Sequence, residues 1–144
     1  TALVTCGVNA FAQRPVNSLS GGQRQRCFIA MVLAQMPEIL LLDEPTSFLD
    51  ITHQLNILTI LKNMRNNADT TIVMALHDIA QAADMADHLV VLAEGKIVAN
   101  GPPEDILSKE MLREVFGIEA RLFHDHETGK LVVVPIRLAE DIKQ

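Results

Sequence analysis

Two carboxylates follow a run of apolar residues with no turn residue between them. The run is Ile39 to Leu42, and Asp43 and Glu44 come directly after it, before Pro45. An uninterrupted apolar run of this length is typical of a strand buried on both faces of a parallel sheet. Because ligands bind at the carboxyl ends of such strands, the pair predicts a metal-nucleotide or hydrolytic site. The alternative is that the strand simply leaves the core here, with both acids solvated and Pro45 ending the pairing.

A second candidate site is a pair of glycines at the expected start of a helix. Ser20 is placed as the N-cap, Gly21, Gly22 and Gln23 follow it, and helix-forming residues continue through Met36. Backbone N–H groups at such a start can approach an anion closely, and the helix dipole adds about half a positive charge. The expected ligand is phosphate. Taken alone, the same residues also fit a flexible turn before a buried helix.

Two further segments place polar side chains at the ends of predicted elements. The apolar strand Thr71 to Leu76 is expected to carry His77 to the same sheet edge as Glu44. A lone histidine after a strand is more often structural, but the carboxylates beside it favour a functional role. Asp50 precedes a run of helical periodicity from Ile51 to Met64 and also fits an ordinary N-cap.

The second half of the chain predicts short elements. A hairpin about Glu94 and Gly95 is expected to extend the sheet, and Gly117 is expected to end a helix that Ser108 caps. Further elements are a helix from Pro102 and Pro103 through Leu107 and a hairpin of residues 121–124 and 130–135. The polar run from His124 to Glu127 is more typical of a solvated turn than of a metal site.

The composition restricts the class of protein. The chain has 144 residues, of which 49% are hydrophobic. This length and composition predict one domain, or part of one, that buries about two-thirds of its unfolded surface. Cys6 and Cys27 have neither metal-ligand spacing nor a dense disulfide pattern, which favours a reducing cytosolic setting. No apolar run approaches the roughly 18 residues of a membrane span. A net charge of −6 and 3% aromatic residues argue against nucleic acid as a partner.

The motifs together resemble those of a known family. LSGGQRQR from Leu19, LLLDEP from Leu40, Phe48-Leu49-Asp50 and the strand that ends in His77-Asp78 resemble the signature motif, Walker B motif, D-loop and switch histidine of ABC-type ATPases. Their order and spacing also match, which makes the resemblance specific. It implies an α/β fold, a partial P-loop NTPase-type domain with a mainly parallel sheet, flanking helices and a C-terminal β-hairpin extension. Residues 1–117 would be the carboxyl-terminal part of the nucleotide-binding domain, and residues 118–144 the extension.

The resemblance also implies a role for each candidate residue, with ATP and Mg²⁺ as cofactors. Asp43 would hold the magnesium, Glu44 would be the general base, and His77 would contact the terminal phosphate. Asp50 would carry information across a dimer interface. The segment formed by Ser20, Gly21, Gly22 and Gln23 would bind the γ-phosphate of ATP held by the other subunit.

One part of the family pattern is missing from these residues. Neither Gly95-Lys96 nor Gly129-Lys130 has the preceding glycine spacing or the following Ser/Thr of a Walker A motif. The upstream adenine-stacking aromatic residue and the Q-loop are also absent. We therefore expect the 144 residues to be a fragment or truncated product that alone neither binds ATP tightly nor hydrolyses it.

Within the family, the segments Leu49 to Gln54, Ile29 to Gln35 and Leu76 to Asp78 look most like importers of iron-siderophore complexes, haem or cobalamin. The partners implied are a second ATP-binding subunit in a homodimer, a membrane permease and, through the permease, an external substrate-binding protein. The ATPase would be peripheral, on the cytoplasmic face of the cell membrane. Nucleic acid is not an expected partner.

Two other functions stay open. One is an ABC-type ATPase of DNA repair or translation, although the short span from Gln23 to Asp43 leaves no room for a coiled-coil arm. The other is a noncatalytic remnant that binds an intact homologue. Co-purification with a polytopic membrane protein would favour transport, and association with DNA or ribosomes would favour the first rival.

Overall fold

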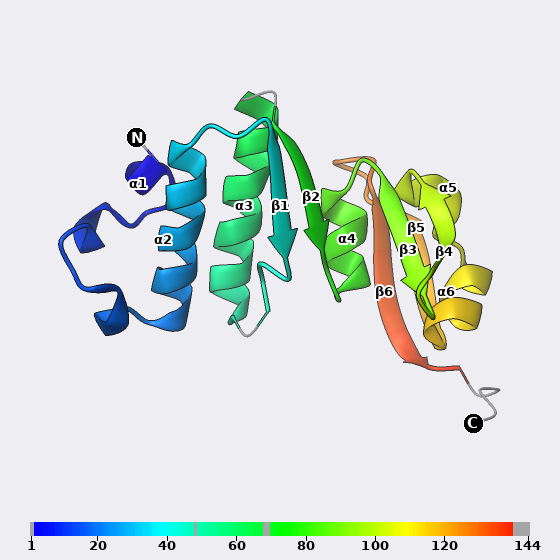
Figure 1. The fold of residues 1–144 in the computed structure, drawn as a ribbon. Helices are drawn as coiled ribbons and strands as arrows, with labels where there is room; N and C mark the ends of the chain where they lie inside the picture. The colour runs from blue at the N-terminus through cyan, green and yellow to red at the C-terminus, as the bar shows by residue number, and fades with distance from the viewer. Residues whose placement is uncertain (1, 48, 68–69, 140–144) are drawn as a thin grey trace. The chain divides into compact units, whose positions relative to one another are not determined.

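The computed structural model describes residues 2–47, 49–67 and 70–139. The chain divides into two compact units, Thr1–Leu76 and His77–Gln144. Phe48, the first residue of the predicted D-loop, lies outside the described residues. Figure 1 gives the elements of both units in chain order.

The first unit places helices beside one pair of parallel strands. Its elements are α1 (Ala2–Thr5), two 3₁₀ turns (Asn9–Phe11 and Val16–Ser18), α2 (Gly21–Ala34), β1 (Ile39–Asp43), α3 (Ile51–Asn67) and β2 (Thr71–Ala75). Strands β1 and β2 pair from Ile39 opposite Thr71 to Asp43 opposite Ala75. The predicted helices and strands of this unit are therefore present, and both strands end at the same edge of their sheet.

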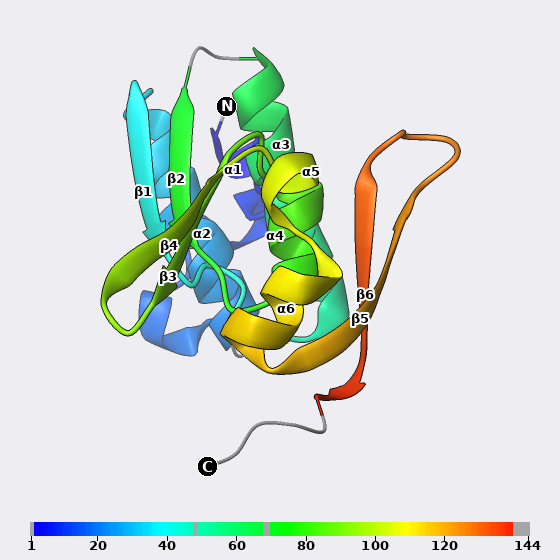
Figure 2. The same cartoon turned by 90° about the vertical axis from the view of Figure 1, so that its right-hand side faces the viewer.

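The expectation that β1 is buried on both faces is wrong for the described residues. Leu40 is 4% exposed, whereas Ile39 and Leu41 on the other face of the strand are 64% and 72% exposed. Figure 2 shows α3 on one side of the β1 and β2 pair. Residues of α3 such as Ile57 and Leu61 are fully buried in the core of this unit, so only one face of the sheet is covered.

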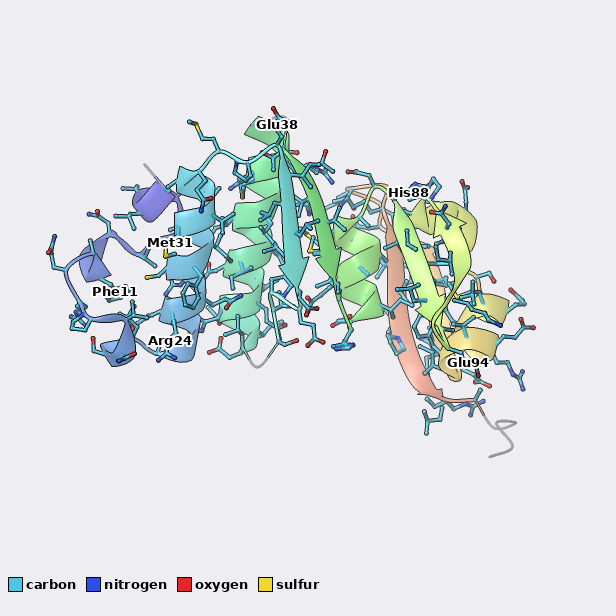
Figure 3. All side chains as sticks on the ribbon, viewed as in Figure 1. Phe11, Arg24, Met31, Glu38, His88 and Glu94 are labelled. Atoms are coloured by element: carbon cyan, nitrogen blue, oxygen red, sulfur yellow. The ribbon has the colours of Figure 1, made fainter. Side chains whose placement is uncertain are left out.

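The described part of the second unit, residues 77–139, contains two antiparallel hairpins and three short helices. Its elements are α4 (Ile79–Met85), β3 (Leu89–Ala93), β4 (Lys96–Gly101), α5 (Pro103–Ile106), α6 (Lys109–Phe116), β5 (Ile118–His124) and β6 (Leu131–Leu138). Glu94 and Gly95 both have positive φ, 50° and 73°, and they form the two-residue turn between β3 and β4. Figure 3 shows His88 and Glu94 at the two ends of β3.

Local signals at helix ends are confirmed in this unit. The Ser108 hydroxyl accepts a hydrogen bond from the Met111 N–H at 3.0 Å and caps α6. Gly117 ends α6 in the left-handed conformation, as predicted. A core cluster lies between α6, α4 and the β5 and β6 hairpin; its buried members are Ala83, Leu107, Leu112, Ala120, Leu131 and Val133.

The prediction that the β3 and β4 hairpin extends the first sheet is wrong. Among the described residues there are three separate two-stranded sheets, one parallel and two antiparallel. The parallel part of the fold is therefore smaller than the sequence indicated. The boundary after Gly117 coincides with the end of α6 and the start of β5, and its meaning as a domain boundary stays a prediction.

The described part of the chain also shows the state of the cysteines and the character of the helices. Cys6 and Cys27 are both free thiols. Across residues 2–47, 49–67 and 70–139, we find no helix with the length and apolar character needed to cross a membrane.

Candidate functional site

The start of α2 is fixed by a pair of reciprocal hydrogen bonds. The Gln23 N–H donates to the Ser20 hydroxyl at 3.3 Å, and the Ser20 N–H donates to the Gln23 side-chain oxygen at 3.0 Å. This is the capping box, so Ser20 is the N-cap that the sequence predicted. The first N–H groups of a helix have no partner within it, and in α2 they include those of Gly21 and Gly22. This helix start is suited to an anion.

Gly22 lies directly against an imidazole ring. A Cβ atom at this position would be 2.5 Å from His53 Cδ2, closer than carbon atoms approach each other in proteins. A Cβ atom at Gly21 would meet nothing within 4 Å. The two glycines therefore differ in their surroundings. A side chain would have room at Gly21 but would clash with the His53 ring at Gly22.

Asp43 and Glu44 lie at the carboxyl end of β1, as predicted. Asp43 is the last residue of the strand and is exposed, whereas Glu44 is half-buried. The Glu44 N–H donates to the Ala75 carbonyl at 3.2 Å, so the chain stays beside β2 for one residue after the strand ends. Glu44 then turns with a φ of 46°, which is unusual for a residue with a side chain.

The Glu44 side chain is oriented by a nearby hydroxyl. Ser47 Oγ donates to Glu44 Oε2 at 2.8 Å, and the Ser47 N–H donates to the Glu44 carbonyl at 3.1 Å. These bonds form a tight turn over Pro45 and Thr46, which are both buried. One oxygen of the Glu44 carboxylate is therefore held in a defined direction.

Asp50 is the N-cap of α3. Its Oδ1 accepts the His53 backbone N–H at 2.9 Å, and its Oδ2 lies 2.7 Å from the Nδ1 of the His53 ring. The hydrogen bond from the His53 backbone N–H, followed by the one from its ring, lowers the pKa of the Asp50 carboxyl. Asp50 is exposed and ionised at neutral pH, so it can also meet a partner outside this unit.

Side-chain contacts join these segments within the first unit. Gln25 Nε2 on α2 donates to the Pro45 carbonyl, 3.4 Å away, in the turn that follows Glu44. His53 joins Asp50 to Gly22 at the start of α2. The phosphate-type helix start, the carboxylate turn and the cap of α3 are therefore linked in one folded unit.

Sequence reasoning missed the three residues that make these links: Gln25, Ser47 and His53. His53 is three residues after a predicted N-cap, a spacing at which a side chain can return to the cap, and this signal could have identified it. Gln25 and Ser47 have no comparable local signal, because their partners depend on how α2 and β1 pack. His77 is the first residue of the second unit, and its approach to the carboxylates stays a prediction.

Asp43 fits a magnesium ion by its chemistry. Magnesium is a hard cation that takes one or two carboxylates and completes its shell with waters and phosphate oxygens. An exposed carboxylate at the end of a parallel strand meets that requirement. Within residues 2–47, 49–67 and 70–139, no group of three or more His, Cys, Asp or Glu side chains is placed to hold a metal ion. This search covers the turn that follows His124.

Comparison with known proteins agrees with the motifs and the geometry. The family model described as ABC transporter matches residues 1–47. The chain is 44% identical over 135 residues to the ferric enterobactin transport ATP-binding protein FepC of Escherichia coli (strain K12), covering 94% of this chain and 50% of that protein. It is 48% identical over 126 residues to the petrobactin import ATP-binding protein FpuC of Bacillus anthracis, covering 88% of this chain and 46% of that protein.

A solved structure shows the same fold. A metal-chelate type ABC transporter in an inward-facing conformation matches with a TM-score of 0.82 and 31% identity, over 94% of this chain and 54% of that one. The chain spans about half the length of the curated relatives it matches. The motifs, the fold and the identity to these proteins agree, and the chain corresponds to the carboxyl-terminal part of an ABC transporter ATPase domain.

Proposed function

We propose that the chain forms part of the ATP-binding subunit of an ABC importer, in which ATP hydrolysis drives uptake of an iron-siderophore, haem or cobalamin-type cargo. The observation that carries this proposal is that one folded unit holds both the capped glycine start of α2 and the carboxylate turn after β1. The first faces phosphate and the second can activate water. The similarity to ATP-binding proteins of ferric enterobactin transport and petrobactin import supports a siderophore cargo.

The proposed mechanism gives each residue one task. Glu44 accepts the proton of the attacking water and must come within about 3 Å of it. The bond from Ser47 holds the carboxylate in one direction, which lowers the entropy lost on reaching that geometry. Asp43 would hold a magnesium ion, which would neutralise charge on the phosphates. His77 contacts the terminal phosphate and fixes its orientation.

The site needs two copies of the subunit. The start of α2, formed by Ser20, Gly21, Gly22 and Gln23, binds the γ-phosphate of the ATP molecule held by the other copy. Asp50 carries information across the interface between the two copies. Hydrolysis is then conditional on dimerisation. The further proposed partners are a membrane permease and, through it, an external substrate-binding protein, and the ATPase is peripheral on the cytoplasmic face of the membrane.

Replacing the proposed base tests the reaction. In a protein that contains these residues and a Walker A motif, Glu44→Gln is expected to abolish turnover while ATP still binds, because the amide cannot accept the proton. The variant should accumulate as an ATP-bound dimer, measured by size-exclusion chromatography with and without ATP. Unchanged turnover would contradict the assignment of Glu44 as the general base.

A matched control lies at the other end of the same strand. Glu38 is exposed just before β1, and its side chain is far along the strand from the carboxylate turn (Figure 3). Glu38→Gln removes the same charge and should leave turnover and the ATP-dependent dimer unchanged. For transport itself, the expected result is co-purification with a polytopic membrane protein, whereas association with DNA or ribosomes would contradict an importer.

A further inference from the structure

A glycine of the phosphate-facing helix start has its space taken by a histidine of another helix. Gly22 is the second residue of α2, and the ring of His53 from α3 fills the position of the missing side chain. A Cβ atom at Gly22 would lie 2.5 Å from Cδ2, 3.0 Å from Cγ and 3.1 Å from Nε2 of that ring. Because all three are ring atoms of one side chain, a larger residue could be accommodated only if the whole imidazole moved.

Moving the ring would break its bond to Asp50. The two oxygens of the Asp50 carboxylate accept from the His53 backbone N–H at 2.9 Å and from its ring Nδ1 at 2.7 Å. An ionised carboxylate only accepts hydrogen bonds, so Nδ1 carries the proton and the opposite edge of the ring, at Cδ2, faces Gly22. The imidazole is therefore clamped between the cap of one helix and the start of another.

We propose that His53 is a positioning residue that fixes the start of α2 relative to Asp50, and that Gly22 lacks a side chain because the His53 ring takes its place. The contact lies inside one folded unit and needs neither nucleotide nor a second subunit. It links the two segments to which the proposed function assigns contacts across the dimer interface.

The functional consequence rests on the proposed function. Ser20 and Gln23 cap the same turn that His53 supports, so the ring sets the direction of the N–H groups that would meet phosphate. Loss of the ring should loosen that turn and weaken nucleotide-dependent association. We expect the KM for ATP to rise several-fold, while kcat at saturating ATP changes less, because the base and the metal carboxylate are untouched.

A double-mutant cycle in the complete protein, without nucleotide, tests the contact itself. Gly22→Ala should lower the midpoint of urea unfolding, although alanine is the better helix former, because it pushes the ring away from Asp50. His53→Asn keeps a donor for Asp50 and removes the ring edge, so the double variant should regain most of the loss. We expect the unfolding equilibrium constants to depart from additivity by about fivefold or more, as residues in direct contact do.

Gly21→Ala is the matched control for this cycle. It makes the same change one residue earlier in the helix, where the new Cβ atom meets nothing within 4 Å, so its effect should be independent of residue 53. A spectroscopic signature accompanies the cycle: the ring signals of His53 in a ¹H–¹³C spectrum should shift in Gly22→Ala and stay in place in Gly21→Ala. Additive effects at Gly22 and His53, or unmoved ring signals, would overturn the contact.

The two proposals fail in different ways. If the complete protein shows no ATP turnover, the proposed function fails and the expected change in KM falls with it, while the coupling of Gly22 to His53 still decides the contact. If turnover is normal and His53→Ala leaves the KM for ATP unchanged, the positioning role fails while the ATPase stands. Partial recovery of the KM in His53→Asn supports positioning through the bond to Asp50.

Discussion

At the scale of single residues, the bond between Ser47 and Glu44 gives a prediction for catalysis. Removing the hydroxyl in Ser47→Ala loosens the orientation of the Glu44 carboxylate, because Oε2 loses the donor 2.8 Å away. Since a small misplacement of a general base affects the reaction more than binding, kcat should fall by about tenfold with little change in the KM for ATP. Steady-state kinetics measure both constants. Ser47→Thr keeps the hydroxyl and should retain most of kcat; equal kcat in the alanine and threonine variants would contradict this role.

The buried thiol of Cys6 gives a prediction for reactivity and for stability. Burial, with a smaller contribution from the neighbouring Cys27, raises the pKa of the Cys6 thiol from 9.0 to about 11, against the opposing effect of Arg26. Because the thiolate is the reactive form, Cys6 should resist alkylation by iodoacetamide at pH 8 until the protein unfolds. Mass spectrometry of peptides from native and urea-unfolded protein measures this.

The sign of the pH effect follows from the same shift in pKa. The folded state holds the Cys6 proton more tightly than the unfolded state, so its contribution to stability is complete below pH 9 and is lost as the pH rises towards 11. Cys6→Ala should show a smaller fall in the unfolding midpoint over that range than the unchanged chain. A native Cys6 that is alkylated as fast as the unfolded thiol would contradict its burial.

How well each residue could be predicted depends on where its partners lie in the chain. Ser20, Glu94 and Gly117 act on residues within one turn of themselves, so their roles in capping and turning follow from local rules. The contact of His53 with Gly22 joins two helices, and the bond of Gln25 to the Pro45 carbonyl joins a helix to a turn. Such contacts are set by packing, which local patterns do not specify.

At the scale of elements, Asp50 stabilises the start of α3 through its charge as well as its geometry. Asn is an equally good N-cap, so Asp50→Asn keeps most of the cap and removes only the charge. The bonds from His53 lower the pKa of Asp50 below 3.8, so the charged cap stabilises the fold at higher pH and that stabilisation is lost as the pH falls through the lowered pKa. The difference in unfolding midpoint between wild type and Asp50→Asn, measured from pH 7 to pH 2, should shrink at the acidic end. A difference that stays constant would contradict a role for the charge.

The strands show the limit of apolar pattern as a guide to burial. The run from Ile39 to Leu42 correctly predicted a strand whose end carries Asp43 and Glu44. The same run suggested cover on both faces, but β1 pairs only with β2 and exposes Ile39 and Leu41. An apolar run indicates that a strand is suited to burial, but whether each of its faces is covered depends on the rest of the fold. For the same reason, the β3 and β4 hairpin was predicted correctly while its place in a sheet was not.

At the scale of the whole molecule, the elements that carry chemistry are concentrated in the first unit. The capped start of α2, the turn after β1 and the cap of α3 all lie in Thr1–Leu76. The second unit begins at His77 and has its own core around Leu112. The proposed roles therefore fall on residues of both units, with Asp43 and Glu44 in the first and His77 in the second.

What the 144 residues lack can be stated from structure as well as from sequence. A P-loop runs from a strand into the start of a helix, where its backbone N–H groups and lysine hold phosphate. The lysines of the two Gly-Lys pairs instead lie at hairpins: Lys96 begins β4 after the turn at Gly95, and Lys130 follows Gly129 just before β6. Lys130 is also held by Asp84, with Nζ and Oδ1 3.2 Å apart. Neither lysine is placed to take the role of the Walker A residue.

The 144 residues by themselves should therefore show no hydrolysis that depends on Glu44. A general base positioned by Ser47 can activate water only against a phosphate that is held in place, and these residues contain no Walker A motif to hold it. The measurement is release of inorganic phosphate by the 144-residue chain beside its Glu44→Gln variant at the same concentration. Both should give the same background, and both should give the same circular dichroism spectrum as a control for folding. Turnover that falls in the Glu44→Gln variant would mean that a complete site exists within these residues, and that one of the hairpin lysines, or another group, supplies the missing phosphate contact.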